Sequence, residues 1–277
     1  MSRVQYCIKG VSYVRYTTDH DLHIHSNLSS CSKCPEQTPE RIAQYAQDAG
    51  LHTICLTDHF WDETVPGASA WYEKQNYPHI CQAKPLPQPE GARFLFGCET
   101  ELDKNLTLGI SRERMDSMDF INIPVTHFHM KLVMDPEDRA SQEARIRLWL
   151  SRLDGLLSME LPFHKIGLAH LTCPLIAVER EDYLRTLEAL PEDRMKLLFG
   201  KAAQVGVGIE LNAYDIKAAE GAEDIVLRPY RIAKEQGCKF YCGSDSHSPS
   251  GFTRAKERFE KAISFLELSE EDKFILA

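Results

Sequence analysis

Histidine and acidic residues recur in short groups along this chain. His23 and His25 lie two residues apart, so their side chains would point the same way on a strand. Five further groups follow, and they are Asp58-His59, Glu99, His127-Phe128-His129, His170 and Asp245-Ser246-His247. Imidazole binds zinc, manganese and iron, and carboxylates bind and bridge hard divalent ions. These residue types therefore predict a site for more than one divalent metal ion.

Scattered polar loop residues are the alternative interpretation. That alternative explains any single group, because a lone H-x-H is as often incidental as functional. However, seven of the 11 histidines fall in these groups, and the four outside are His20, His52, His79 and His164. A buried histidine cluster without metal would leave donors and acceptors unpaired, at about 1–3 kcal/mol each. The metal site is the better explanation of the whole set.

Strands alternate with helices along the chain, and the groups fall at the strand ends. We expect strands at residues 21–25, 53–57, 93–99, 120–125, 166–170, 207–211 and 239–243. Helices are expected at residues 38–50, 136–159, 191–205, 226–236 and 253–266. Such alternation predicts parallel strands with helical crossovers, whose carboxyl ends gather on one face. Seven units favour a closed or nearly closed barrel over an open sheet.

Composition limits the remaining possibilities. With 277 residues and 43% hydrophobic residues, the chain is long enough for one large α/β domain spanning residues 1–277. The net charge of −9 argues against nucleic acid as a partner, because binding phosphates requires a basic face. No apolar run is long enough for a signal peptide or a membrane span, so we expect a cytoplasmic protein. The sequence says little about the oligomeric state.

Residues 60–91 break the alternation. This stretch contains two tryptophans and five prolines and has no clean period. It predicts a long loop after the second strand, on the face where barrel enzymes keep their active sites. A cover over the substrate and a plain surface excursion are both compatible with it.

The order of the groups resembles that of a known family. The succession is H-I-H at 23–25, T-D-H at 57–59, G-C-E at 97–99, T-H at 126–127, A-H at 169–170, E-L-N at 210–212 and G-S-D-S-H at 243–247. From Asp21 to about Pro249, it resembles the PHP (polymerase and histidinol phosphatase) family of metal-dependent phosphoesterases. The resemblance implies a distorted seven-stranded (β/α)7 TIM-like barrel with two to three divalent ions of zinc, manganese or iron.

The resemblance also implies which residues bind each ion. The first ion would be held by His23, His25, Glu99 and Asp245, the second by Glu99, His127 and His170, and the third by His59 and His247. Glu101 could compete with Glu99 for the bridging position, since both point the same way on a strand. The family often completes the third site with a histidine or aspartate shortly after the H-x-H. Here Cys31, as a thiolate, or water would take that position, and Asp58 would orient His59.

The activity implied by the resemblance is hydrolysis of a small phosphomonoester, such as histidinol phosphate, by a metal-bridged hydroxide. Glu99, Asp245 and His247 would form the catalytic centre. On the substrate side we expect His129, Glu210 and, as the cation for phosphate, Arg254, with Arg139 and Arg145 behind it. The alternatives are an amidohydrolase-like enzyme acting on a C–N or ester bond, and a non-catalytic PHP accessory module.

Overall fold

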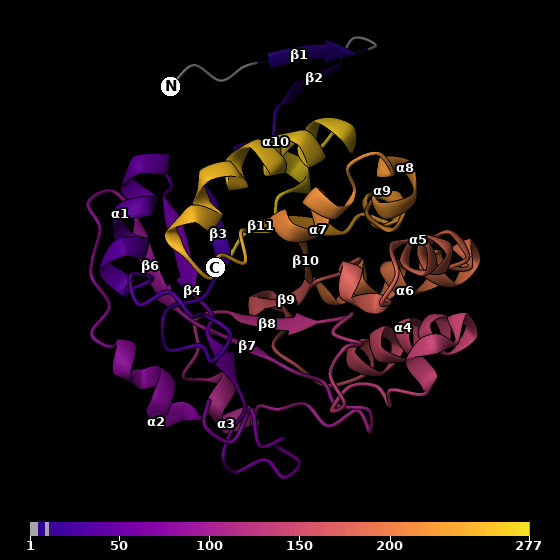
Figure 1. The fold of residues 1–277 in the computed structure, drawn as a ribbon. Helices are drawn as coiled ribbons and strands as arrows, with labels where there is room; N and C mark the ends of the chain where they lie inside the picture. The colour runs from indigo at the N-terminus through magenta and orange to yellow at the C-terminus, as the bar shows by residue number, and fades with distance from the viewer. Residues whose placement is uncertain (1–4, 9–10, 277) are drawn as a thin grey trace.

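Two parallel sheets form the centre of the molecule. The computed structural model describes residues 5–8 and 11–276, with side chains from Val14 onward. The first sheet has the order β3-β4-β6, formed by β3 (His20–Ile24), β4 (Thr53–Leu56) and β6 (Arg93–Phe96). The second has the order β11-β10-β9-β8-β7-β5. Its strands are β5 (His59–Phe60), β7 (Cys98–Thr100), β8 (Ile121–Pro124), β9 (Ile166–Ala169), β10 (Gly208–Asn212) and β11 (Lys239–Gly243) (Figure 1). The parallel α/β architecture expected from the alternation is confirmed.

One predicted strand is interrupted. The sequence predicts a continuous strand over residues 93–99, whereas β6 ends at Phe96 and β7 begins at Cys98. A Cβ atom on the intervening Gly97 would lie 2.2 Å from the carbonyl oxygen of Phe120, so only glycine fits there. A second interruption separates β4, which ends at Leu56, from β5, which begins at His59. As a result β5 pairs with β7, and His59 lies directly opposite Glu99.

The first and last strands of the set lie side by side. A parallel bridge joins Ile24 to Ser246. The backbone N–H of Asp245 donates to the carbonyl of His23 at 2.7 Å, and that of His25 donates to the carbonyl of Ser246 at 3.1 Å. Residues near the beginning and the end of the chain therefore share one edge.

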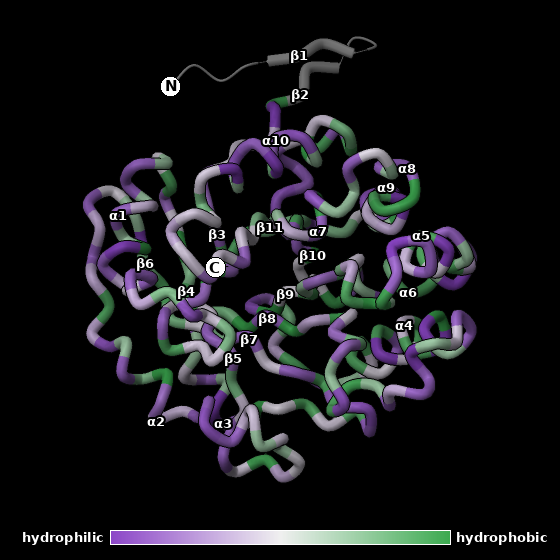
Figure 2. The backbone as a smooth tube through the Cα atoms, in the orientation of Figure 1, coloured by the Kyte–Doolittle hydropathy of each residue, from purple (hydrophilic) through white to green (hydrophobic). Residues whose placement is uncertain are grey.

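Helices surround the strands (Figure 1). The longer ones are α1 (Pro39–Ala49), α4 (Gln142–Leu157), α5 (Arg180–Glu188), α6 (Glu192–Val205), α9 (Arg228–Glu235) and α10 (Ala255–Phe265). The short ones are α2 (Tyr77–Ile80), α3 (Arg112–Met115), α7 (Ala213–Ala218) and α8 (Glu223–Val226). Hydrophobic and hydrophilic residues alternate along them in Figure 2, as expected when one side of each helix faces the strands.

Both ends of α1 are as the sequence predicts, whereas α4 starts later than predicted. The Thr38 side chain accepts from the backbone N–H of Arg41, and Gly50 ends α1 with a left-handed φ of 66°. The helix expected over residues 136–159 begins only at Gln142. Ser141 caps it there, by accepting from the backbone N–H of Ala144. Helix α5 was not expected.

Outside the parallel sheets, β1 (Gln5–Ile8) and β2 (Val11–Val14) form an antiparallel pair that the sequence does not predict. Among the described residues, no helix is both long and apolar enough to cross a membrane.

Candidate metal centre

The first group of predicted ligands meets at the junction of the two sheets. The Nε2 atoms of His23 and His25 are 3.1 Å apart. His25 Nε2 lies 3.4 Å from Oε2 of Glu99 and 3.2 Å from Oδ1 of Asp245. His23 Nε2 lies 3.5 Å from Oε1 of Glu99. Four donor residues from three separate parts of the chain thus face one point.

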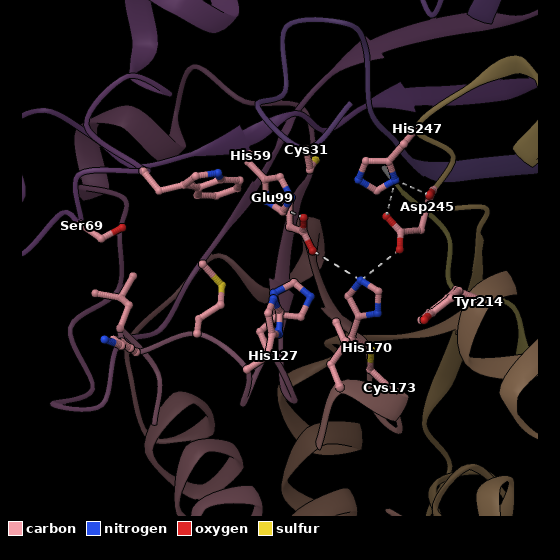
Figure 3. Close-up of a pocket in the computed structure, with 16 residues that line it drawn as sticks. Cys31, His59, Ser69, Glu99, His127, His170, Cys173, Tyr214, Asp245 and His247 are labelled. Carbon is pink, nitrogen blue, oxygen red and sulfur yellow. Dashed lines mark hydrogen bonds and ion pairs between the residues drawn. The ribbon is translucent and has the colours of Figure 1, made fainter. Parts of the chain in front are cut away.

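A second group shares Glu99 with the first. One donor atom from each of Glu99, His127 and His170 lies within 4.8 Å of the others. His170 Nε2 is 3.6 Å from Oε1 of Glu99 and 3.3 Å from Oδ2 of Asp245, as the dashed lines in Figure 3 show. Glu99 and Asp245 therefore both lie between the two groups, where a bridging carboxylate would have to be.

A third group lies on the other side of Glu99. It consists of His25, Cys31, His59 and His247, again with donor atoms within 4.8 Å of one another. His59 Nδ1 is 2.8 Å from Oε2 of Glu99, and the rings of His25 and His247 stack with centroids 4.3 Å apart. The structure thus brings Cys31 to the histidines of the predicted third site, where neither a histidine nor an aspartate follows the H-I-H.

The polar atoms at the centre lack ordinary partners. Both carboxylate oxygens of Glu99 are buried without a hydrogen bond. The same holds for Nδ1 of His59, whose 2.8 Å approach to Glu99 does not have hydrogen-bond geometry. Unpartnered buried carboxylate and imidazole atoms are costly unless a cation satisfies them. Divalent ions fit this donor set, since they bind oxygen and imidazole nitrogen together.

Four of the imidazoles, beginning with those of His23 and His127, are held at the nitrogen that faces away from the centre. Glu210 Oε1 lies 2.6 Å from His23 Nδ1, and Glu101 Oε1 lies 2.5 Å from His127 Nδ1. Such partners fix the ring orientation and the tautomer of metal-binding histidines.

His25 and His170 are held in the same manner. Ser29 Oγ lies 3.0 Å from His25 Nδ1, and Asp215 Oδ1 lies 3.3 Å from His170 Nδ1. The opposite nitrogen of each ring is thereby directed to the shared centre.

The predicted role of Glu210 in substrate binding is corrected by this arrangement. Its side chain is fully buried behind His23, and its second oxygen accepts from the backbone N–H of His170 at 3.0 Å. Gly243 makes room for it, because a Cβ there would lie 2.0 Å from Oε1 of Glu210. Glu210 positions two histidines and does not reach the cavity.

Two other acids make contacts that differ from those predicted. Glu101, the predicted competitor of Glu99, lies behind His127 and 3.6 Å from Nη2 of the buried Arg152. Asp58 does not orient His59. It accepts from the backbone N–H of Ser26 at 2.7 Å and from the hydroxyl of Ser29 at 2.8 Å, and so holds the loop that follows His25.

Burial and neighbouring charges set the protonation of the groups. Burial lowers the pKa of His59, and it lowers that of His247 to about 4, with help from His25. Burial alone would lower the pKa of His23 and raise that of Glu99. The carboxylates, Glu210 foremost, instead raise the pKa of His23, and His59 and His23 lower that of Glu99 well below its usual value. The surrounding imidazoles thus favour the ionised form of Glu99.

Two of the predicted ligands have an unusual backbone. His170 has a φ of 50° and Asp245 a φ of 52°, in the left-handed region that few residues other than glycine adopt. The hydrogen bonds from His170 N–H to Glu210 and from Asp245 N–H to the His23 carbonyl maintain these conformations. Such strain concentrates at functional sites, where the surrounding structure enforces it.

A cavity of about 620 Å³ opens onto the three groups. Its lining includes His129, which was expected to face the substrate, and Ser69 and Trp71 from the 60–91 segment. The lining also contains six residues that were not expected there, namely Met130, Lys131, Leu132, Cys173, Leu175 and Tyr214. The labelled side chains in Figure 3 come from both sides of the cavity, with Ser69 and Tyr214 at opposite sides of the histidines.

The predicted arginine cation does not line the cavity. Arg254 is exposed and pairs with Glu257 at 2.8 Å, at the start of α10. Arg139 donates to the carbonyl of Leu175 at 3.0 Å, and Arg145 donates to the carbonyl of Arg139 at 2.6 Å. None of the three arginines lines the cavity. The cationic side chain on the cavity wall is Lys131, whose only sequence signal was its place four residues after His127.

Comparison with known proteins identifies solved structures that share this fold. No protein-family profile matches the chain, and no curated protein matches it in sequence. Among solved structures, the histidinol phosphate phosphatase of Lactococcus lactis, in complex with zinc, L-histidinol and phosphate, matches with a TM-score of 0.57 and 16% identity, over 88% of this chain and 94% of that one. A protein assigned as a histidinol phosphatase of Listeria monocytogenes matches with a TM-score of 0.59 and 11% identity, over 87% and 99%. At these identities the comparison shows a shared fold.

Proposed function

We propose that the chain is a metal-dependent phosphomonoesterase of the PHP family. The observation that carries this proposal is the position of Glu99. Its two buried, unpartnered oxygens lie between separate sets of histidines. The shared fold with histidinol phosphatases supports the same conclusion.

The architecture that goes with this proposal is a distorted seven-stranded (β/α)7 TIM-like barrel in a single domain. In it, the broken strands β4–β5 and β6–β7 each count as one, and β11 closes against β3. The bridge between Ile24 and Ser246 supports the closure. The 60–91 segment would be an insertion that contributes Ser69 and Trp71 to the active-site wall.

We propose two or three divalent ions, held by the three groups of residues described above. Zinc is the first candidate, because zinc is bound in the Lactococcus lactis structure and because Cys31 adds sulfur to the third group. Divalent ions in such a site supply the positive charge that lowers the pKa of water and neutralises phosphate oxygens.

The protein itself performs the positioning. Glu99 and Asp245 keep the first two groups at a fixed separation, and Glu210 and Glu101 hold the imidazole rings of His23 and His127 in place. In the cavity, His129 and Lys131 are exposed polar side chains that can meet a phosphate ester. Lys131 takes the role that was expected of Arg254.

The proposal is tested by elemental analysis of the purified protein, together with a panel of phosphomonoesters and diesters assayed with zinc, manganese or iron. Release of phosphate from monoesters by protein with bound metal is the expected result. Full metal loading with no ester hydrolysed would reject the phosphatase function, and cleavage of amides or carboxylic esters instead would favour the amidohydrolase alternative.

Glu99→Gln is the decisive variant. It should abolish both metal loading and turnover, because glutamine cannot supply two anionic oxygens to shared ions. Glu257→Gln, at an exposed acid outside the cavity, is the matched control and should change neither. Wild-type activity in the Glu99→Gln variant would show that the bridge is a different acid.

A further inference from the structure

The outer wall of the cavity is apolar and aromatic. Its apolar and aromatic lining consists of Trp71, Met130, Leu132, Leu175 and Tyr214, and Ser69, His129, Lys131 and Cys173 line the cavity beside them. The side chains of Trp71 and Tyr214 are unusually open for aromatic residues, at 37% and 43% exposed. Exposed aromatic rings in a concave site commonly mark where a ligand binds.

The wall carries no negative charge for a substrate. Among the described lining residues, the acids are Glu99 and Asp245, and both belong to the metal groups. Lys131 adds a positive charge, and His129 is either neutral or positively charged. An ammonium group on the leaving alcohol would therefore meet no free carboxylate.

The acids that lie just behind the site add no free negative charge to the cavity wall. Glu101, Glu210 and Asp215 are at most 1% exposed. Each is already bound to an imidazole, at 2.5 Å, 2.6 Å and 3.3 Å respectively. Their charges are used in orienting histidines, and a ligand in the cavity cannot reach them.

Neighbouring residues hold the two aromatic residues in place. The Trp71 ring contacts the ring of Tyr72 edge-on at 4.7 Å between centroids and that of His59 at 5.0 Å. Tyr214 is fixed at the first turn of α7, where the Asn212 side chain accepts from its backbone N–H at 2.8 Å. The Trp71 ring and the backbone of Tyr214 are thus positioned before a ligand arrives, which reduces the entropy lost on binding.

We propose that the site selects phosphomonoesters whose leaving alcohol is flat or apolar and carries no ammonium group, with Trp71 and Tyr214 as the specificity-determining residues. This inference rests on the proposed phosphatase function. In the reaction, water adds to phosphorus, the ester P–O bond breaks, and the alkoxide takes a proton to leave as the neutral alcohol. The apolar part of the wall, around Trp71 and Tyr214, receives that alcohol. Esters that carry an ammonium, such as histidinol phosphate, are poor substrates.

The test compares primary alkyl esters, so that leaving-group reactivity stays similar. With zinc-loaded full-length protein, kcat/KM is measured for 2-phenylethyl phosphate, O-phosphoethanolamine and L-histidinol phosphate. We expect the phenylethyl ester to be favoured at least about tenfold over both ammonium esters, because an unpaired charge is expensive to desolvate. Equal or better turnover of the ammonium esters would overturn the inference and leave the phosphatase function standing. No turnover of any ester would instead count against the function itself.

Variants identify the residues responsible. Trp71→Ala and Tyr214→Ala should each lower kcat/KM for the phenylethyl ester by about threefold to tenfold, through KM, because an aromatic contact of ordinary strength is lost. Phosphoethanolamine should be unaffected. Trp71→Phe should retain the preference, and Leu197→Ala, at an exposed apolar residue of α6, is the control. Equal losses for both esters in protein with normal zinc content and melting temperature would refute the specificity role.

Discussion

Replacing Glu101 with glutamine removes the charge behind His127 while keeping the shape of the side chain. Glu101 Oε1 lies 2.5 Å from His127 Nδ1, and the other oxygen lies 3.6 Å from Nη2 of Arg152. Loss of such an orienting partner weakens metal binding by about ten- to a hundredfold, about 1.4 to 2.8 kcal/mol of binding free energy. Because His127 belongs only to the second group, one ion should be weakened and the ions at the other groups retained.

Stability should change less than the buried position of Glu101 suggests. Arg152 keeps hydrogen bonds to the carbonyls of Val125 at 3.0 Å and Pro124 at 2.9 Å, and a further one to Leu102. Breaking a fully buried ion pair costs about 3–5 kcal/mol when the remaining charge has no other partner. With these carbonyls in place, we expect a loss below that range in urea unfolding of the metal-free protein.

The assay is zinc competition against a chromophoric chelator, which resolves each binding step. Glu113→Gln, at an exposed acid in α3, serves as the control and should bind zinc like the wild type. If the Glu101→Gln protein retained all wild-type zinc affinities, the assignment of Glu101 as the orienting partner of His127 would be refuted. If all ions were lost together, the groups would not be separable sites.

Three further substitutions test other parts of the site. Cys31→Ser should lower the zinc affinity of the third group at least about tenfold, since loss of a residue that only orients a metal ligand already costs that much. It should also remove the thiolate absorption band of the cobalt-substituted protein. An unchanged spectrum would exclude Cys31 as a ligand. Gly243→Ala places a Cβ 2.0 Å from Glu210 Oε1. It should lower the free energy of unfolding by about 1–3 kcal/mol and also lower the zinc affinity. Unfolding at the wild-type urea concentration would contradict this expectation. Lys131→Ala should raise KM for phosphate esters by about two- to fivefold with kcat maintained, as suits an exposed charge, and an unaltered KM would remove Lys131 from substrate binding.

The strands were predictable because their buried apolar runs are local in the sequence. Those expected at residues 120–125, 166–170 and 239–243 agree with β8, β9 and β11 to within a residue. The interruption at Gly97 was not predictable, since its cause is the carbonyl of Phe120 on a neighbouring strand. Helix α5 was missed because Glu179 makes no capping hydrogen bond and few of its residues are buried.

The candidate site shows the same division. Residue type and order were sufficient to pick out the histidines, Glu99 and Asp245, since few other residues bind divalent ions. The contacts of each side chain could not be predicted from the sequence. Arg254 follows His247 closely in sequence but turns to Glu257, and Glu210 reaches His23 only because Gly243 leaves room.

The adjacency of β3 and β11 has a consequence for biosynthesis. His23 and Asp245 meet in one group, although nearly the whole chain separates them. A ribosome-bound chain that has not yet released Asp245 cannot assemble this group, whatever else has folded. If the first group binds an ion as proposed, ion uptake there is a late event, and its completion reports that the last strand has docked beside the first.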